Sequence, residues 1–288
     1  MLAGHTRALL DRYALASRAL SRVGGERSST ESGQSVEFHD FRPYQPGDEL
    51  RYVDWRVYAR TGRLTTRLYQ AERAVQLHLL LDTTRSMGQD GKLEHARTLV
   101  RLLSYVAQRD APTQLHLLDG SATPRARGRR GMAATWAFLD AATLLAGEAQ
   151  GPLSGLVSFA RRLPAVRGRA LVIFVSDLLE DAPIEPSLVA LRSRRFDVGF
   201  LQLVSARELD PPAGRFELHD VETGARLDAG PEEAAAYRDE VRRHVRRVRA
   251  AIVRAGYRHQ LLVTPEVDVG DEREAFGALV RSGVLVRR

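Results

Sequence analysis

Five short apolar runs alternate along the chain with longer stretches of helical period. The runs cover residues 75–81, 114–118, 171–176, 198–204 and 260–263. Between them, apolar residues recur every three or four positions, which is typical of helices with one buried face. Strands that alternate with helices predict a mostly parallel sheet with helices on both faces. The unbroken run Leu-Val-Ile-Phe-Val at 171–175 favours a strand buried on both sides. We therefore expect a three-layer, Rossmann-like α/β fold.

The remaining pattern predicts three segments. Residues 1–33 combine apolar positions at helical spacing over 2–23 with a polar linker. Residues 34–73 hold short strands and turn signals, which predict a small β element. Residues 74–288 contain the α/β domain, with a hairpin insertion expected near 209–229 and a long helix expected over 231–255. Pro231 suits the first turn of that helix and Gly256 its end.

Oxygen-bearing side chains follow two of the expected strands. Asp82, Thr84 and Ser86 come after the run that ends at 81, and Asp177 comes after the run that ends at 176. Ligands of doubly wound sheets bind at the carboxyl ends of the strands. Carboxylates and hydroxyls suit a hard cation such as Mg²⁺, with Mn²⁺ or Ca²⁺ as substitutes. The alternative is purely structural, because Asp and Thr after a strand also cap helices and form turns.

The preceding segment carries a longer motif. Residues 37–51 read Glu-Phe-His-Asp-Phe-Arg-Pro-Tyr-Gln-Pro-Gly-Asp-Glu-Leu-Arg, and the motif continues with Asp54-Trp55 and Ala59-Arg60. This segment resembles the signature of domain-of-unknown-function family 58. Members of that family carry a von Willebrand factor A-like domain and are commonly encoded beside MoxR-type AAA+ ATPases. The resemblance runs from about Glu37 to the C-terminus and implies a von Willebrand factor A-like sheet.

The same resemblance implies a metal-ion-dependent adhesion site. Asp82, Thr84 and Ser86 take the roles of its first loop, and Asp177 takes the role of the later carboxylate. The family usually has serine where Thr84 stands. Von Willebrand factor A domains also supply a threonine from a middle loop, for which Ser154 is the best substitute here. The implied partners are a MoxR-type ATPase and an unknown client protein that offers a carboxylate to the metal.

Charged and aromatic residues of the signature have two interpretations. They form either a docking surface beside the metal or a set of ion pairs and turn hydrogen bonds that hold the β element together. The residues concerned are Asp40, Arg42, Asp48, Arg51, Asp54, Trp55 and Arg60.

Composition excludes sites that need cysteine, and the charge of the chain suggests an alternative function. The chain has no cysteine, which excludes disulfides and zinc–thiolate sites. Its formal net charge of +7 allows a basic nucleic-acid-binding protein as an alternative, through the arginines at 125–130 and on the long helix. Aromatic residues do not interleave with those arginines, so nucleic acid is the weaker hypothesis. A metal-dependent phosphoryl hydrolase is the second alternative.

No acid–base pair around a pocket is apparent, so we expect a protein that is not an enzyme. No apolar stretch approaches the roughly 20 residues of a membrane span, and the first residues lack the apolar core of a signal peptide. We expect a cytoplasmic protein. The combined prediction is a metal-dependent protein-interaction module, acting as an adaptor or chaperone-like partner of a MoxR-type ATPase.

Overall fold

Two compact units make up the chain in a computed structural model. The first comprises Met1–Gly25 with Val75–Arg288, and the second comprises Glu26–Ala74. The structure describes residues 2–15, 36–46, 48, 50–71, 76–145, 151–163, 170–194, 196–211, 216–219, 226–266 and 268–288.

A parallel sheet of five strands forms the centre of the first unit. Its spatial order is β10-β7-β6-β4-β5. The strands are β4 (Gln76–Leu81), β5 (Thr113–Leu117), β6 (Ala170–Ser176), β7 (Asp197–Ser205) and β10 (Arg258–Thr264). Every pairing in it is parallel. The mixed α/β fold with a parallel sheet is therefore confirmed.

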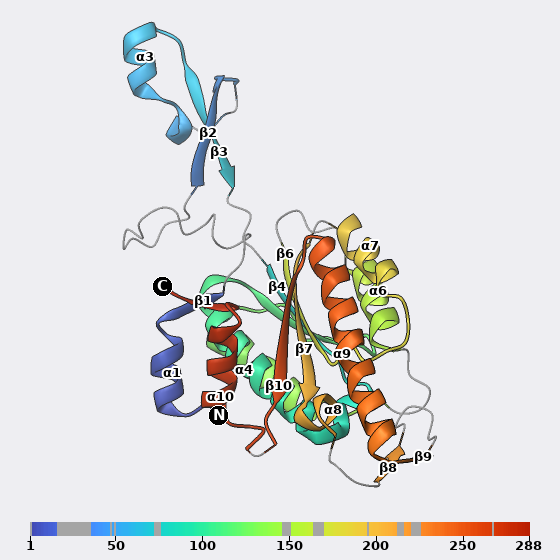
Figure 1. The fold of residues 1–288 in the computed structure, drawn as a ribbon. Coiled ribbons are helices and arrows are strands. Elements are labelled where there is room, and N and C mark those ends of the chain that lie inside the picture. The colour runs from blue at the N-terminus through green and yellow to red at the C-terminus, as the bar shows by residue number, and fades with distance from the viewer. Residues whose placement is uncertain are drawn as a thin grey trace. The chain divides into compact units, whose positions relative to one another are not determined.

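Helices cover both faces of this sheet because its strands carry apolar side chains on both sides. In β6, Leu171 and Ile173 pack into one core while Val172 and Phe174 pack into the other. The first core is closed by α1 (Gly4–Leu10), α4 (Lys92–Asp110), α5 (Gly128–Ala141) and α10 (Glu272–Arg281). The second is closed by α6 (Pro152–Arg162), α7 (Glu185–Ser193) and α9 (Pro231–Arg254), which lie together in Figure 1.

The N-terminal segment differs from the single helix expected over 2–23. The helix α1 ends at Leu10, and β1 (Tyr13–Leu15) then pairs antiparallel with β11 (Leu285–Arg287). Leu15 is buried opposite Leu285 in this pairing. A long-range strand pairing thus overrides the helical spacing. Residues 16–35 lie outside the described residues, and so does the polar linker that the sequence predicts.

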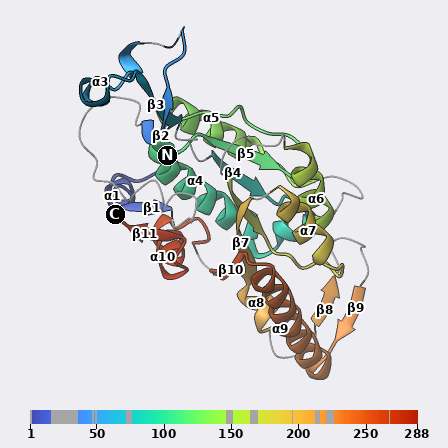
Figure 2. The same cartoon turned by 90° about the horizontal axis from the view of Figure 1, so that it is seen from above.

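The expected hairpin insertion is present. The strands β8 (Phe216–His219) and β9 (Arg226–Ala229) pair antiparallel and lie beside α9 (Figure 2). The turn at 222–224 lies outside the described residues. A short helix, α8 (Ala206–Leu209), comes directly after β7 at the edge of the sheet.

The second unit is a two-stranded sheet with one helix. Its strands β2 (Val36–Pro43) and β3 (Thr65–Ala71) pair antiparallel with a register shift near Phe38. Between them lie a 3-10 turn, η1 (Leu50–Tyr52), and the helix α3 (Trp55–Thr61). Asp54 begins α3 because its side chain accepts hydrogen bonds from the backbone N–H groups of Arg56 and Val57.

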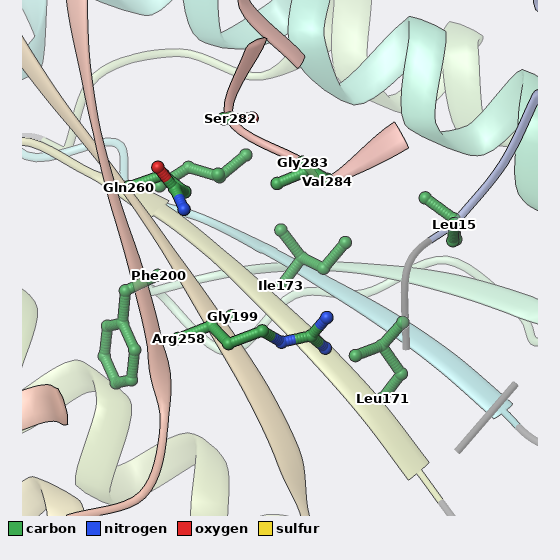
Figure 3. Close-up of a pocket in the computed structure, with 11 residues that line it drawn as sticks. Leu15, Leu171, Ile173, Gly199, Phe200, Arg258, Gln260, Ser282, Gly283 and Val284 are labelled. Carbon is green, nitrogen blue, oxygen red and sulfur yellow. The ribbon is translucent and has the colours of Figure 1, made fainter. Parts of the chain in front are cut away.

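A small cavity lies where the sheet meets the β1–β11 ribbon. Gly199 on β7 is opposite both Ile173 on β6 and Arg258 on β10, and Leu15 and Val284 are among the other lining residues (Figure 3). The cavity measures about 40 Å³, enough for a few water molecules and too small for an organic ligand. The missing side chain of Gly199 helps to create this hollow, because a methyl group added there would meet no heavy atom within 4 Å.

Replacing Gly199 with alanine should therefore stabilise the protein by about 0.5–1 kcal/mol, because alanine lowers the entropy of the unfolded chain without a clash. Urea unfolding measures the change. The control is Gly91→Ala, where a φ of +71° and a methyl position 2.7 Å from Val269 should make the same change destabilising. A loss of stability in Gly199→Ala would contradict the prediction.

Candidate functional site

The best-placed site is the carboxyl edge of the sheet between β4 and β6. From β4 the chain passes to β5 on one side, and it later crosses back to β6 on the other side. Such a reversal leaves a crevice between the two strands at their carboxyl ends, where doubly wound sheets bind ligands. Asp82 follows β4 there, and Ser176 ends β6.

Asp82 is fully buried and holds the first loop in place. Its Oδ1 accepts hydrogen bonds from the backbone N–H of Thr84 at 2.8 Å and from the Thr84 hydroxyl at 2.7 Å. Its Oδ2 accepts a 2.5 Å hydrogen bond from the hydroxyl of Ser176. The side chain thus joins the ends of two neighbouring strands, because it has partners on both.

A pair of hydroxyls lies on the outer side of this carboxylate. The Oγ1 of Thr84 and the Oγ of Ser86 are 3.1 Å apart. Thr84 is buried, while Ser86 is half-buried and lies nearer the solvent. In an octahedral Mg²⁺ site, neighbouring oxygen ligands at about 2.1 Å from the ion are about 3.0 Å from each other. The hydroxyl pair therefore has a spacing that fits a small divalent cation.

Asp177 has a different environment from the one expected. Its Oδ2 accepts a 2.8 Å hydrogen bond from Nζ of Lys92, the first residue of α4. The same ammonium donates to Oε1 of Glu208 on α8 at 2.6 Å. The Lys92 side chain is 0% exposed, Asp177 1% and Glu208 14%. Asp177 is therefore paired with a cation of the chain itself, which it shares with Glu208.

The electrostatics follow from burial and from these charges. Burial, followed by the negative charge of Asp177, raises the pKa of Asp82 to about 7, although the hydrogen bonds from Ser176 and Thr84 oppose the shift. Burial alone would lower the pKa of Lys92, but the charges of Asp177 and Glu208 outweigh it and raise that pKa above its ordinary value. A further positive charge at this edge would stabilise ionised Asp82.

A second layer of hydrogen bonds fixes the loop after β6. The carboxamide of Gln202 on β7 donates to the backbone oxygen of Asp177 at 2.8 Å. The Oε1 of Gln202 lies 2.9 Å from Nε2 of His259 on β10. All three residues are buried. The position of Asp177 is therefore fixed by Gln202 on β7, which His259 on β10 holds in turn.

The residues predicted for the metal do not all meet. Asp82, Thr84 and Ser86 form one hydrogen-bonded group, and Asp177 follows Ser176, which bonds to Asp82. Ser154 lies exposed in the first turn of α6, and its hydroxyl donates to the backbone oxygen of Gly151 at 2.9 Å. Among the described residues, no group of three or more His, Asp or Glu side chains is arranged to hold a metal. A cation at this edge would depend on hydroxyl ligands.

The signature residues of the second unit have mixed roles. Arg42 and Asp48 form an ion pair at 2.5 Å, and Asp48 also accepts hydrogen bonds from the Gln45 backbone at 3.0 Å and the Thr66 hydroxyl at 3.1 Å. The hydrogen bond from the Gln45 backbone, followed by that from Arg42, holds the pKa of Asp48 below its ordinary value. Buried Asp54 begins α3, as described above. These contacts match the structural interpretation.

Other signature residues face solvent. Trp55 is 55% exposed and packs edge-on against Tyr58 at 6.2 Å, and Arg60 is exposed. Large aromatic side chains and arginines are enriched where proteins bind one another. These side chains therefore keep the docking interpretation open. The side chains of Asp40 and Arg51 lie outside the described residues.

Three residues of the site were given no role by sequence reasoning. Ser176, Lys92 and Glu208 complete the network around the two aspartates. One signal was available, because Lys92 is the only lysine among the 43 Lys and Arg residues of the chain. A compact ammonium on a flexible stem can enter a space that a planar guanidinium does not fit. Nothing in the sequence indicated Glu208, which reaches Lys92 only through the fold.

Comparison with known proteins agrees with the signature. The family described as "Protein of unknown function DUF58" matches residues 40–251, which is more than half of the chain. The chain belongs to the DUF58 family. Two similar DUF58 relatives are the uncharacterized proteins Rv1480 of Mycobacterium tuberculosis and Mb1516 of Mycobacterium bovis. Each is 29% identical over 237 residues, covering 74% of this chain and 72% of the relative.

Similar solved structures are more distant. An aerotolerance-related membrane protein from Bacteroides fragilis aligns with a TM-score of 0.43 and 15% identity, over 72% of this chain and 99% of its own. The proximal thread matrix protein 1 of the mussel byssus aligns with a TM-score of 0.36 and 13% identity, over 46% and 38% of the two chains. Neither similarity bears on function. No helix within the described part of this DUF58 chain has the length and apolarity to cross a bilayer.

Proposed function

We propose that this DUF58 protein is a non-enzymatic protein-interaction module of the von Willebrand factor A type, which holds a divalent cation at Asp82, Thr84 and Ser86. The observation that carries the proposal is the 3.1 Å distance between the hydroxyl oxygens of Thr84 and Ser86, beside the buried carboxylate of Asp82. They lie at the crevice between the carboxyl ends of β4 and β6. Thr84 and Ser86 would be direct ligands, and Asp82 would orient them and balance the charge. When bound, such an ion supplies an open coordination position for a carboxylate of the partner.

Lys92 changes the role that we assign to Asp177. Because its carboxylate is held by an ammonium at 2.8 Å, we do not assign Asp177 as a ligand of the cation. Its part is to fix the loop after β6, together with Lys92 and Glu208. The cation site then carries one buried carboxylate and two hydroxyls, which suits weak, reversible binding of metal and partner.

The partner that we propose is a MoxR-type AAA+ ATPase, with a client protein as the second ligand. The support for it is the DUF58 membership, since the resemblance described above implies a MoxR-type ATPase as partner. The ATPase would supply the work, and this chain would hold the client or couple it to the ATPase. The exposed Trp55 and Arg60 of the second unit offer a separate surface for contact.

The proposal predicts saturable binding of Mn²⁺, used as a spectroscopic substitute for Mg²⁺, with about one ion per chain. Ser86→Ala and Asp82→Asn should each weaken that binding about 10–100-fold, because one removes a ligand and the other an orienting carboxylate. Electron paramagnetic resonance of free Mn²⁺ gives the affinity. Capture of a purified MoxR-type ATPase should fall in parallel with the affinity and be lost in chelator.

The matched control is Ser154→Ala, which removes a serine hydroxyl that bonds to Gly151 and not to the cluster. It should leave Mn²⁺ binding unchanged. Weakened Mn²⁺ binding in Ser154→Ala together with unchanged Mn²⁺ binding in Ser86→Ala would show that the cation does not bind at the proposed residues. Absence of saturable Mn²⁺ binding in the wild-type chain would refute the metal site.

A further inference from the structure

The two edges of the central sheet differ in what covers them. Along β5, the following segment of the chain forms isolated antiparallel bridges, Ala126 with Thr113 and Ala122 with His116. At the opposite edge, β10 pairs with β7 on its inner side, and no backbone hydrogen bond within the described part of the chain reaches residues 259–264 from the outer side. Every second residue of such an edge strand directs its backbone N–H and C=O away from the sheet, where another chain can pair with them.

Two apolar side chains of β10 are exposed at this edge. Leu261 is 37% exposed and Val263 47%, whereas Leu262 between them is buried in the first core. Alternation along the strand therefore places Leu261 and Val263 on the other face of the sheet, which α9 covers. Soluble proteins commonly protect such an edge with lysine, proline or a β-bulge. Residues 259–264 contain no lysine or proline, and their register with β7 is unbroken, so this edge is open to a further strand.

Arginines of α9 run along the same edge. On one flank of the helix, Nε2 of His244 lies 2.7 Å from the backbone oxygen of Leu178, which follows β6, so this flank faces the middle of the sheet. Arg242 and Arg249 lie about 150° around the helix from His244 and therefore on the flank toward β10. Burial, followed by the charge of Arg249, lowers the pKa of His259 on β10 to about 4, which agrees with this placement. Both arginines are exposed and form no ion pair with any residue that the structure describes.

We propose that the outer edge of β10 binds an extended, acidic segment of a partner protein as an added strand of the sheet. Backbone hydrogen bonds would hold the segment along β10, and its apolar side chains would cover Leu261 and Val263. Its acidic side chains would pair with Arg242 and Arg249, which have no ion-pair partner among the described residues. The proposal does not rest on the cation site, because none of these residues belongs to it.

A second copy of the chain fits this edge less well than an acidic partner. Antiparallel pairing of two β10 strands about a two-fold axis would continue the sheet and place both α9 helices on the same face. The flanks that carry Arg242 and Arg249 would then face each other across the junction, and like charges at an interface oppose association. The charge of this edge therefore favours a segment of the opposite sign.

A designed peptide, acetyl-Val-Thr-Glu-Thr-Val-Thr-Glu-Thr-Val-amide, tests the edge. Its valines and glutamates share one face of a strand, and its sequence reads the same in both directions, so it can pair parallel or antiparallel. Its glutamates are about 13 Å apart in a strand, close to the roughly 10 Å between Arg242 and Arg249 along α9. The control peptide has lysine in place of both glutamates and should bind about tenfold more weakly.

The measurement is a titration of each peptide into ¹⁵N-labelled full-length protein in the presence of chelator. The glutamate peptide should shift the backbone amide signals of residues 259–264 saturably. At saturation, every second one of these amides should exchange with solvent about tenfold more slowly, because it gains a hydrogen bond to the peptide.

Two sets of variants assign the binding to this edge. Val263→Lys should weaken binding of the glutamate peptide about tenfold, because it places a charge where the peptide buries its valines. Val189→Lys, which changes an exposed valine on α7, should bind as the wild type does. The double variant Arg242→Glu, Arg249→Glu should bind the lysine peptide better than the glutamate peptide, whereas Arg130→Glu on α5 should keep the wild-type preference.

Three results would overturn the proposal. The first is the absence of saturable shifts in residues 259–264, and the second is equal binding of the two peptides by the wild-type chain. The third is a wild-type dimer in sedimentation velocity that Val263→Lys dissociates, because it would assign the edge to a second copy of the chain.

Discussion

Replacing Lys92 with methionine should lower the free energy of unfolding by about 3–5 kcal/mol, the largest effect that we expect from a single substitution. Methionine has a similar length but no charge, so Asp177 and Glu208 would remain buried or half-buried without their common cation. The negative charge of Asp177 already raises the pKa of Asp82, and its repulsion of the Asp82 carboxylate would increase without Lys92. Chemical denaturation at pH 7.5 measures the loss.

Two comparisons separate this effect from the loss of a side chain. In Arg243→Met, a cation is removed from an exposed ion pair with Glu240, and the cost should stay below about 1 kcal/mol. The triple variant Lys92→Met, Asp177→Asn, Glu208→Gln also removes the stranded charges and should recover much of the stability. A loss as small as that of Arg243→Met would mean that Lys92 does not neutralise the pair.

Acid should destabilise the protein steeply between pH 6.5 and 4. Burial lowers the pKa of His78 to about 4, of His116 to about 3 and of His259 to about 4. In this range the unfolded chain binds a proton at each histidine and the folded chain does not, so stability present above pH 6.5 is lost as the pH falls. Asp82 acts in the opposite direction, because its raised pKa makes the folded state bind one proton more.

These four groups give a net difference of about two protons, three from the histidines less one from Asp82, which corresponds to about 2.7 kcal/mol per pH unit. Burial lowers the pKa of His95 as well, and this makes the slope steeper. Urea unfolding at half-unit steps of pH gives the slope. His116→Gln removes one titrating ring and should reduce the slope by about 1.4 kcal/mol per pH unit. A flat profile between pH 7 and 5 would contradict the assignment.

Two of these histidines are buried beside each other, so a charged form of either ring would lose its hydration. Nδ1 of His78 lies 3.0 Å from Nε2 of His116 on the neighbouring strand, and the His116 ring packs edge-on against Phe159 at 5.0 Å. The two histidines are 38 positions apart in the chain and meet because β4 pairs with β5.

Tertiary contacts also account for the places where sequence reasoning failed. The helical spacing over 2–23 predicted one helix, but β1 forms at Tyr13–Leu15 because β11, some 270 residues later, offers a strand partner. The partner strand has no signal within the residues that neighbour Tyr13–Leu15 in the chain.

The sequence alone determined the five strands of the parallel sheet and the grouping of Asp82, Thr84 and Ser86 in one loop. These features depend on residue periodicity and on short separations along the chain, both of which can be seen in the sequence. Only the tertiary structure decided which cation lies beside Asp177. The contacts of Lys92 span 85 residues to Asp177 and 116 residues to Glu208, and charges so far apart in sequence meet only when the sheet edge is complete.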